Sequence, residues 1–225
     1  MENIFILGDS ISKGILFDNI KEKYTLYNDS FLNKLYRLYP QYVQSKTKFG
    51  ATIQHAYKYL NEKLNILQSD YIVMEYGGND CDFHWDAIAN NPYEEHKPKT
   101  PLNEYSAIME EIINKVISCG KKVILSTLPP IDSKKYFNFL TQNDEIKGDK
   151  ILIWLKNIDN ISRWQESYNN IIWKNAMKYN CLILDIRTPF LQSMNCSEYL
   201  CDDGIHPNEQ GHNLIYNTIR NTFNI

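Results

Sequence analysis

Residues 3–14 read NIFILGDSISKG, and this stretch decides the fold into which the rest of the chain has to fit. Its four consecutive apolar residues, Ile4–Leu7, are typical of a parallel strand that is covered on both faces. Gly8 ends the run, and a glycine lets the chain turn sharply there. Ser10 follows at the carboxyl end of the strand, where open parallel sheets keep their functional crevice. Ser10 is therefore a candidate for chemistry, although a serine in this place can also cap a following helix.

Three further apolar runs have the same character, and amphipathic helix patterns separate them. The runs are Tyr71–Met74, Val123–Leu125 and Leu182–Leu184, and a weaker alternation over 42–47 predicts a strand near the sheet edge. Helical spacing predicts helices over about 30–39, 53–67, 105–117 and 161–172, with a last helix opened by Pro207. Strands that alternate with helices predict one α/β domain, residues 1–225, with three layers (α/β/α) around a mainly parallel, flavodoxin-like sheet.

Three segments lack a clear period. Residues 15–29 read as a polar connection, residues 81–101 as a long loop with three prolines, and residues 131–160 as an irregular lobe over the carboxyl edge of the sheet. Trp85 and Trp154 lie in the last two segments. These tryptophans either form a substrate wall or provide hydrophobic cover for the sheet, and the sequence favours neither.

Composition excludes several classes of protein. The net charge of -3, from 24 basic and 27 acidic residues, offers no electrostatic footprint for nucleic acid. No stretch of 18 apolar residues exists, so we expect no membrane span. The amino-terminal residues do not resemble a secretory signal, and five cysteines without a regular spacing favour reduced thiols. We therefore expect a cytoplasmic protein, and the sequence does not indicate its oligomeric state.

Small polar residues gather where the predicted strands end, and they suit acyl transfer. A serine hydroxyl needs a neutral imidazole to take its proton, and the imidazole needs a carboxylate to fix its tautomer. Asp203 and His206 are three residues apart in a glycine-containing turn, close enough for a local hydrogen bond. The oxyanion of the tetrahedral intermediate needs donors, and the candidates are the N–H groups of Ser10 and Gly50 and the side-chain amide of Asn79.

Four blocks of the chain together resemble the SGNH (GDSL-type) hydrolases. They are Gly8-Asp9-Ser10-Ile11 with Gly14, an isolated Gly50, Gly77-x-Asn79-Asp80, and Asp203-x-x-His206-Pro207, in the family's order and over nearly the whole domain. Ile11 replaces the usual leucine, and the block around Gly50 is the least distinctive. The resemblance implies that Ser10 is the nucleophile, that His206 is its base and that Asp203 is the partner of His206. It also implies that Ser10, Gly50 and Asn79 form the oxyanion hole.

The predicted function is a metal-independent serine esterase or acylhydrolase that works through a covalent acyl-enzyme and uses no cofactor. We expect a small-molecule ester with a short acyl group, such as an acetyl group on a carbohydrate. Two alternatives are a metallophosphoesterase and a non-catalytic flavodoxin-like binding module. Against the metallophosphoesterase, this chain has no Asp-x-His pair and too few histidines to hold two metal ions. Against the binding module, a protein that only binds a ligand does not need a serine, an Asp-x-x-His pair and an amide donor together.

Other titratable residues have structural interpretations. Asp9 and Asp80 are expected to accept backbone N–H bonds that hold the two tight turns. His212 follows Glu209 by three positions in a predicted helix, which predicts a surface contact between them. His96, among charged neighbours, is expected to be solvated. Pro207 suits the first position of a helix, which would place His206 near a helix N-terminus.

Overall fold

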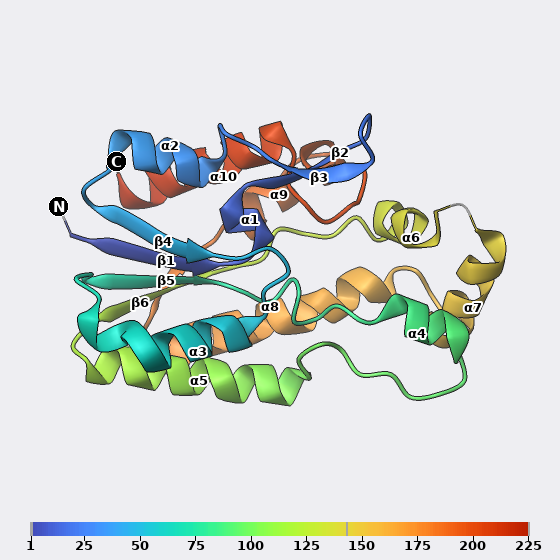
Figure 1. Cartoon of the computed structure of the whole chain (residues 1–225), viewed down its shortest axis with the longest axis horizontal. Helices are drawn as coiled ribbons and strands as arrows, with labels where there is room; N and C mark the ends of the chain where they lie inside the picture. Colours follow the sequence, from blue (N-terminus) through green and yellow to red (C-terminus); the bar gives the residue numbers. More distant parts are fainter. Residues whose placement is uncertain (1, 143, 225) are drawn as a thin grey trace.

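The computed structural model describes residues 2–142 and 144–224, and its centre is a parallel sheet of five strands (Figure 1). The strands are β1 (Ile4–Gly8), β4 (Val43–Thr47), β5 (Tyr71–Glu75), β6 (Lys122–Ser126) and β7 (Leu182–Leu184). Their order in the sheet is β4-β1-β5-β6-β7. The predicted fold class is confirmed, because this order is the flavodoxin-like one and helices cover both faces of the sheet.

The two helical layers form the two halves of the core. One face carries α3 (Ile53–Lys63), α5 (Leu102–Ser118) and α8 (Asn160–Tyr179), and the other carries α2 (Phe31–Leu38), α9 (Arg187–Leu191) and α10 (Glu209–Phe223). Side chains of a strand alternate between its faces. Phe5 and Leu7 accordingly pack with the first layer, and Ile6 packs with the second.

The sequence predicted the ends of these elements well where a cap or a breaker is present. Ser30 caps α2 by accepting from the Asn33 N–H, and Pro40 follows the end of that helix. Gly120 adopts a left-handed backbone (φ +73°) directly after α5. A short 3₁₀ turn, Leu64–Ile66, extends α3 as the helical spacing predicted.

The predicted polar connection over 15–29 is wrong, because this segment contains a β-hairpin. Strands β2 (Ile15–Asp18) and β3 (Lys23–Leu26) pair antiparallel and form a separate two-stranded sheet. Each strand has only four residues and is partly exposed, so neither shows the apolar pattern of a core strand.

The segments over 81–101 and 131–160 are also more regular than predicted. The first contains α4 (Trp85–Asn90), and the second contains α6 (Ser133–Thr141) and α7 (Glu145–Leu155). Asp132 and Asp144 cap α6 and α7. The period of α7 is hidden because five consecutive apolar residues, 151–155, surround the helix on every side. All three helices lie beyond the carboxyl ends of the strands (Figure 1).

The last helix begins later than Pro207. Asn208 is its cap, accepting from the Gly211 N–H at 3.0 Å, and α10 starts at Glu209. Pro207 instead forms an isolated bridge with Leu200. The prediction that Pro207 opens the helix is therefore wrong, and His206 precedes the cap rather than the first helical turn.

Two further observations concern the chain as a whole. All five cysteines are free thiols. Within residues 2–142 and 144–224, no helix has both the length and the apolar character that crossing a membrane requires.

His212 does not lie on the surface, as the sequence predicted, but is completely buried in α10. Its ring lies beside those of Tyr27 and Phe31, with centroids 5.7 and 5.8 Å away. Neither ring nitrogen has a hydrogen-bond partner among the described residues. Burial, with smaller effects of His206 and Lys34, lowers the pKa of His212 to about 4. The folded protein therefore holds this imidazole neutral.

This burial makes stability depend on pH. The pKa of His212 in the folded state lies below its value of about 6.5 in the unfolded state. The contribution of the neutral His212 to the free energy of unfolding is therefore complete above about pH 6.5. It is lost as the pH falls from 6.5 towards 4, because only the unfolded chain then takes up the proton. We expect the His212 contribution to fall by about 2 kcal/mol between pH 7 and pH 5. Urea unfolding at several pH values should show this slope in the wild type and lose it in His212→Leu. The control, His84→Leu at an exposed position, should keep the wild-type slope; parallel curves for the wild type and His212→Leu would contradict the expectation.

Candidate active site

Ser10 lies in the turn that joins the central strand β1 to α1 (Ser10–Lys13). Asp9 caps this short helix, because its Oδ1 accepts from the Ile11 N–H at 2.9 Å. Gly14 ends the helix with a left-handed backbone. The Ser10 residue is only 6% exposed, at the carboxyl edge of the sheet. Asp9 thus holds the turn as predicted.

A chain of hydrogen bonds joins Ser10 to residues almost two hundred positions away. His206 Nε2 lies 2.9 Å from Ser10 Oγ, and His206 Nδ1 lies 2.6 Å from Asp203 Oδ2. Asp203 is completely buried, and its Oδ1 accepts the N–H groups of Ile205 and His206, both at 3.1 Å. The three residues that the sequence singled out as a set are therefore brought together.

The hydrogen-bond partners fix the direction of these bonds. An ionised carboxylate can only accept, so Nδ1 of His206 carries a proton that it donates to Asp203. Nε2 is then the bare nitrogen, and it accepts the hydroxyl proton of Ser10. This is the arrangement in which an imidazole can act as a base towards a serine.

Asn79 follows β5 and faces the same edge of the sheet. Its Nδ2 donates to Asp9 Oδ2 at 2.9 Å, which leaves the second N–H of that amide for another acceptor. Asp80 accepts the Ile53 N–H, at the start of α3, through both carboxylate oxygens at 3.0 and 3.2 Å. Asp80 thus accepts a backbone N–H as predicted, although this N–H belongs to the start of α3 rather than to the turn of Asp80 itself.

Gly50 lies in the turn after β4 with a left-handed backbone (φ +69°), and it is exposed. It does not line the large cavity that Ser10, Asn79 and His206 line. Its use as an oxyanion donor stays a prediction.

Two aromatic rings beside His206 were not predicted. Phe49 stacks parallel to the imidazole at a centroid distance of 6.2 Å, and Tyr24 lies 5.1 Å away. Burial and the nearby Asp203 carboxylate raise the pKa of Tyr24. Phe49 directly precedes Gly50, a predicted site residue, so the sequence already indicated that Phe49 lies near the site. Tyr24 is placed by the hairpin that the sequence did not reveal.

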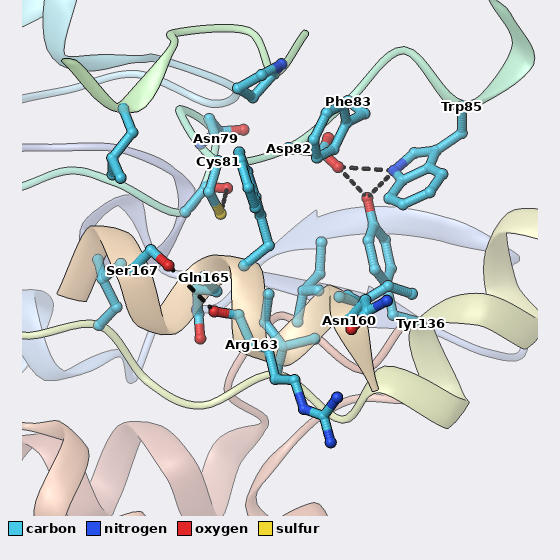
Figure 2. A pocket seen from close by; sticks show the side chains of 18 of the residues that line it. Asn79, Cys81, Asp82, Phe83, Trp85, Tyr136, Asn160, Arg163, Gln165 and Ser167 are labelled. Atoms are coloured by element: carbon cyan, nitrogen blue, oxygen red, sulfur yellow. Dashed lines mark hydrogen bonds between the residues drawn. The ribbon is translucent and has the colours of Figure 1, made fainter. Parts of the chain in front are cut away.

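A cavity of about 1060 Å³ is lined by Ser10 and His206 and by residues of α4, α7 and α8. Figure 2 shows part of its lining, including Asn79, Trp85 and Tyr136. Trp85 is fixed in its wall by hydrogen bonds. Its Nε1 donates to Asp82 Oδ1 at 2.8 Å and to Tyr136 Oη at 3.2 Å, and Tyr136 Oη donates to Asp82 at 2.8 Å. The ring of this tryptophan therefore has a defined orientation.

Trp154 completes an aromatic cluster in the same wall. It packs edge-on against Phe83 at 4.9 Å and against Trp85 at 6.4 Å. The ring of His96 also contacts Trp154, at a centroid distance of 5.8 Å. His96 was predicted to be solvated, but it is half-buried. Both predicted wall residues line the cavity, and both also pack in a buried cluster.

Two buried carboxyl groups lie beneath the Ser10 turn. Burial raises the pKa of Asp9, and burial together with the neighbouring Asp9 raises the pKa of Glu75 well above its usual range. Glu75 Oε2 accepts from Ser12 Oγ at 2.8 Å and from the N–H groups of Ser12 and Asp9 at 3.2 and 3.3 Å. Glu75 was not predicted as a site residue, although a glutamate at the end of an apolar strand was a visible signal in the sequence.

Across the described ranges, 2–142 and 144–224, no group of three or more His, Cys, Asp or Glu side chains is arranged to hold a metal ion.

Comparison with known families finds one match, to the model of the GDSL-like lipase/acylhydrolases, over residues 4–219. No match to a curated protein was found.

Solved structures with the same fold are numerous. A lipase/acylhydrolase from Enterococcus faecalis superposes with a TM-score of 0.68 at 18% identity, covering 99% of this chain and 95% of that one. An acetylxylan esterase from Geobacillus stearothermophilus gives a TM-score of 0.64 at 18% identity, with coverage of 100% and 94%. An α/β hydrolase from the metagenome of Lake Arreo gives 0.65 at 20% identity, with coverage of 99% and 95%. At these identities the likeness establishes the fold.

Proposed function

Because the chain belongs to the GDSL-like lipase/acylhydrolase family and is thus a carboxylic ester hydrolase, we propose that it cleaves esters through Ser10, His206 and Asp203. The observation that carries this proposal is the pair of hydrogen bonds from His206, 2.9 Å to Ser10 Oγ and 2.6 Å to Asp203 Oδ2. Membership of this family favours an esterase over a metallophosphoesterase or a binding module.

In the first half of the reaction, Ser10 Oγ attacks the acyl carbon while its proton passes to His206 Nε2. Asp203 stabilises the imidazolium that forms. The carbonyl oxygen becomes an oxyanion, and the N–H groups of Ser10 and Gly50 and the Asn79 amide donate to it. The C–O bond of the ester then breaks, and His206 returns the proton to the departing alcohol. The acyl group stays on Ser10.

In the second half, water attacks the acyl-enzyme. His206 takes a proton from this water, and the same donors stabilise the second oxyanion. Collapse of the intermediate releases the carboxylic acid, and the proton returns to Ser10 Oγ. No cofactor enters either half.

Asp9 serves this mechanism as a positioning residue. It bonds the N–H of Ile11 next to the nucleophile and also the amide of Asn79. The spacing between nucleophile and oxyanion donor thus depends on one buried carboxyl group. Such preorganised donors are worth roughly 3–4 kcal/mol each in the transition state.

For the substrate, we propose an ester with a short acyl group, such as acetyl, on a bulky alcohol such as a carbohydrate. The volume of the cavity and the fixed tryptophan rings in its wall support a large alcohol part. Flat apolar faces with polar groups around them suit sugar rings, which present both C–H and hydroxyl groups. A cytoplasmic location stays a prediction.

Within the proposed mechanism, the first prediction concerns the nucleophile. Ser10→Ala should keep the fold and lower kcat for an acetyl ester by at least ~10³-fold, because the acyl-enzyme can no longer form. Mass analysis after treatment with a fluorophosphonate should find one adduct, on Ser10, in the wild type and none in the variant. An adduct on another serine, or full turnover by Ser10→Ala, would contradict the mechanism.

The second prediction concerns Asp203. Asp203→Asn keeps the shape of the side chain but stabilises the wrong imidazole tautomer, so kcat should fall by up to ~10⁴-fold. The matched control is Asp202→Asn, because the Asp202 side chain is 66% exposed and lies one residue away. Steady-state kinetics on one acetyl ester should separate the two variants. Equal activity in both would remove Asp203 from the proposed triad.

The third prediction concerns the aromatic wall. Trp85→Ala and Trp154→Ala should lower kcat/KM for an acetylated disaccharide more than for ethyl acetate, by about fivefold for a lost contact of ~1 kcal/mol. Both substrates release acetate, so one assay serves for the comparison. Trp173→Ala is the control, since Trp173 lies on α8 but does not line the cavity. If the substrate ratio stayed constant in both wall variants, the tryptophans would be cover for the sheet only.

A further inference from the structure

A second cavity lies on the opposite side of β1 from the aromatic cluster, between the sheet and helices α2 and α10. Its volume is about 240 Å³, larger than the ~150 Å³ apolar cavity that is known to bind benzene. Its walls are the aliphatic residues that the strands turn towards these helices, such as Ile6, Val73 and Leu184, with Phe31 and Ile215 opposite them. Protein interiors are otherwise packed closely, so a void of this size is a notable gap in the core.

One end of this cavity is polar and lies beneath the Ser10 turn. Glu75, Ser12 and Ser126 line it, and Gly8 pairs with Glu75 in the neighbouring strand. The absence of a side chain at Gly8 makes room for the carboxyl group, because a Cβ there would lie 2.9 Å from Glu75 Oε2. The other end opens at the amino edge of the strands, where Leu182 lines the cavity and is 48% exposed.

Glu75 is the unusual group in this cavity. The residue is 97% buried, and three donors bond its Oε2, whereas its Oε1 has no partner among the described residues. Burial and Asp9 both favour the neutral acid by raising the pKa of Glu75. The acid proton then belongs on Oε1, since the lone pairs of Oε2 are already used. A buried O–H group without an acceptor is destabilising, so a ligand oxygen that meets Oε1 after a rotation of the shielded carboxyl group would be stabilised there.

We propose that this second cavity binds a straight-chain aliphatic alcohol, with its hydroxyl group at Glu75 and its chain along the sheet. The hydroxyl oxygen accepts the proton of Glu75 Oε1. Ser126 Oγ donates to the Thr127 carbonyl and keeps lone pairs that can accept the hydroxyl proton of the ligand. The proposal does not depend on the esterase reaction.

The length of the cavity sets the length of the chain. Glu75 and Gly8 are paired, and so are Tyr71 and Ile4, four residues earlier in each strand. Four strand residues span about 13 Å. An extended carbon chain advances about 1.3 Å per bond, the projection of a ~1.5 Å carbon–carbon bond, so roughly eight to ten carbons fit.

The hydrogen-bonding groups and the burial of the polar end select the head group. A fatty acid would be ionised at neutral pH, and burial opposes a charged carboxylate beside the buried carboxyl groups of Asp9 and Glu75. A hydroxyl group is neutral and both donates and accepts one hydrogen bond. An alkylammonium would need an ionised Glu75, the state that burial disfavours.

The test is calorimetric titration with hexanol, octanol, octanoate and octylammonium, carried out on enzyme whose Ser10 has been blocked by a fluorophosphonate or replaced by Ala. Each buried methylene should tighten Kd about fourfold, so octanol should bind about 15-fold more tightly than hexanol. Octanoate should not bind measurably. No binding of octanol, or tighter binding of octanoate or octylammonium than of octanol, would overturn the proposal.

Variants whose second cavity is filled by a larger side chain show whether octanol binds there or in the large cavity at Ser10. Val73→Phe adds a ring inside the smaller cavity, and Leu184→Phe does the same from another strand, so either one serves if the other fails to fold. Both variants should lose octanol binding, whereas Glu75→Gln should keep it, because the amide N–H can replace the acid O–H. Octanol binding that persists in a folded filling variant would place the ligand elsewhere and overturn the proposal.

Discussion

The arrangement at the carboxyl edge of the sheet depends on one buried carboxyl group, that of Asp9. One of its oxygens holds the N–H of Ile11 in the turn after β1, and the other holds the amide of Asn79 after β5. The two neighbouring strands therefore deliver their functional groups at a fixed separation. Burying a carboxyl group away from water is unfavourable unless the group is hydrogen-bonded. The hydrogen bonds that offset the burial of Asp9 also fix the two segments that donate them, and the site is rigid for this reason. The nucleophile candidate and the amide donor are a single structural unit for this reason.

The sequence was sufficient for the parts of the structure whose pattern is local. Four buried strands and their helices were readable because apolar runs and helical spacing each extend over several residues, as in Ile4–Leu7 and in α5. Ser10, Asn79, Asp203 and His206 could be named because strand ends collect at one edge of a parallel sheet. That reasoning places residues near one another. It does not supply the distances from His206 to its two partners, which depend on how the last loop closes over β1.

The wrong predictions have a common cause. At these residues the structure depends on tertiary contacts, which the local sequence pattern does not reveal. The hairpin β2–β3 is built from short, partly exposed strands, and its Tyr24 reaches His206 only through folding. The second half of helix α7, residues 151–155, has apolar residues on every side, and several of them pack among the helices of its own lobe. His212 has the spacing of a surface residue, yet the layer formed by α2 and α10 encloses it completely. Pro207 is a good helix opener, but Asn208 is the better cap.

The tight fit around Gly8 restricts how this protein can vary in evolution. Any side chain at position 8 would place its Cβ 2.5 Å from Ser12 Oγ and 2.9 Å from Glu75 Oε2. A mutation of Gly8 is therefore accessible only in a background where both neighbours, Ser12 and Glu75, have already changed. These three positions form an epistatic unit. A library that randomises Gly8 alone would sample almost no functional sequence, whereas joint randomisation of the three positions would reveal which alternative sets can support the turn.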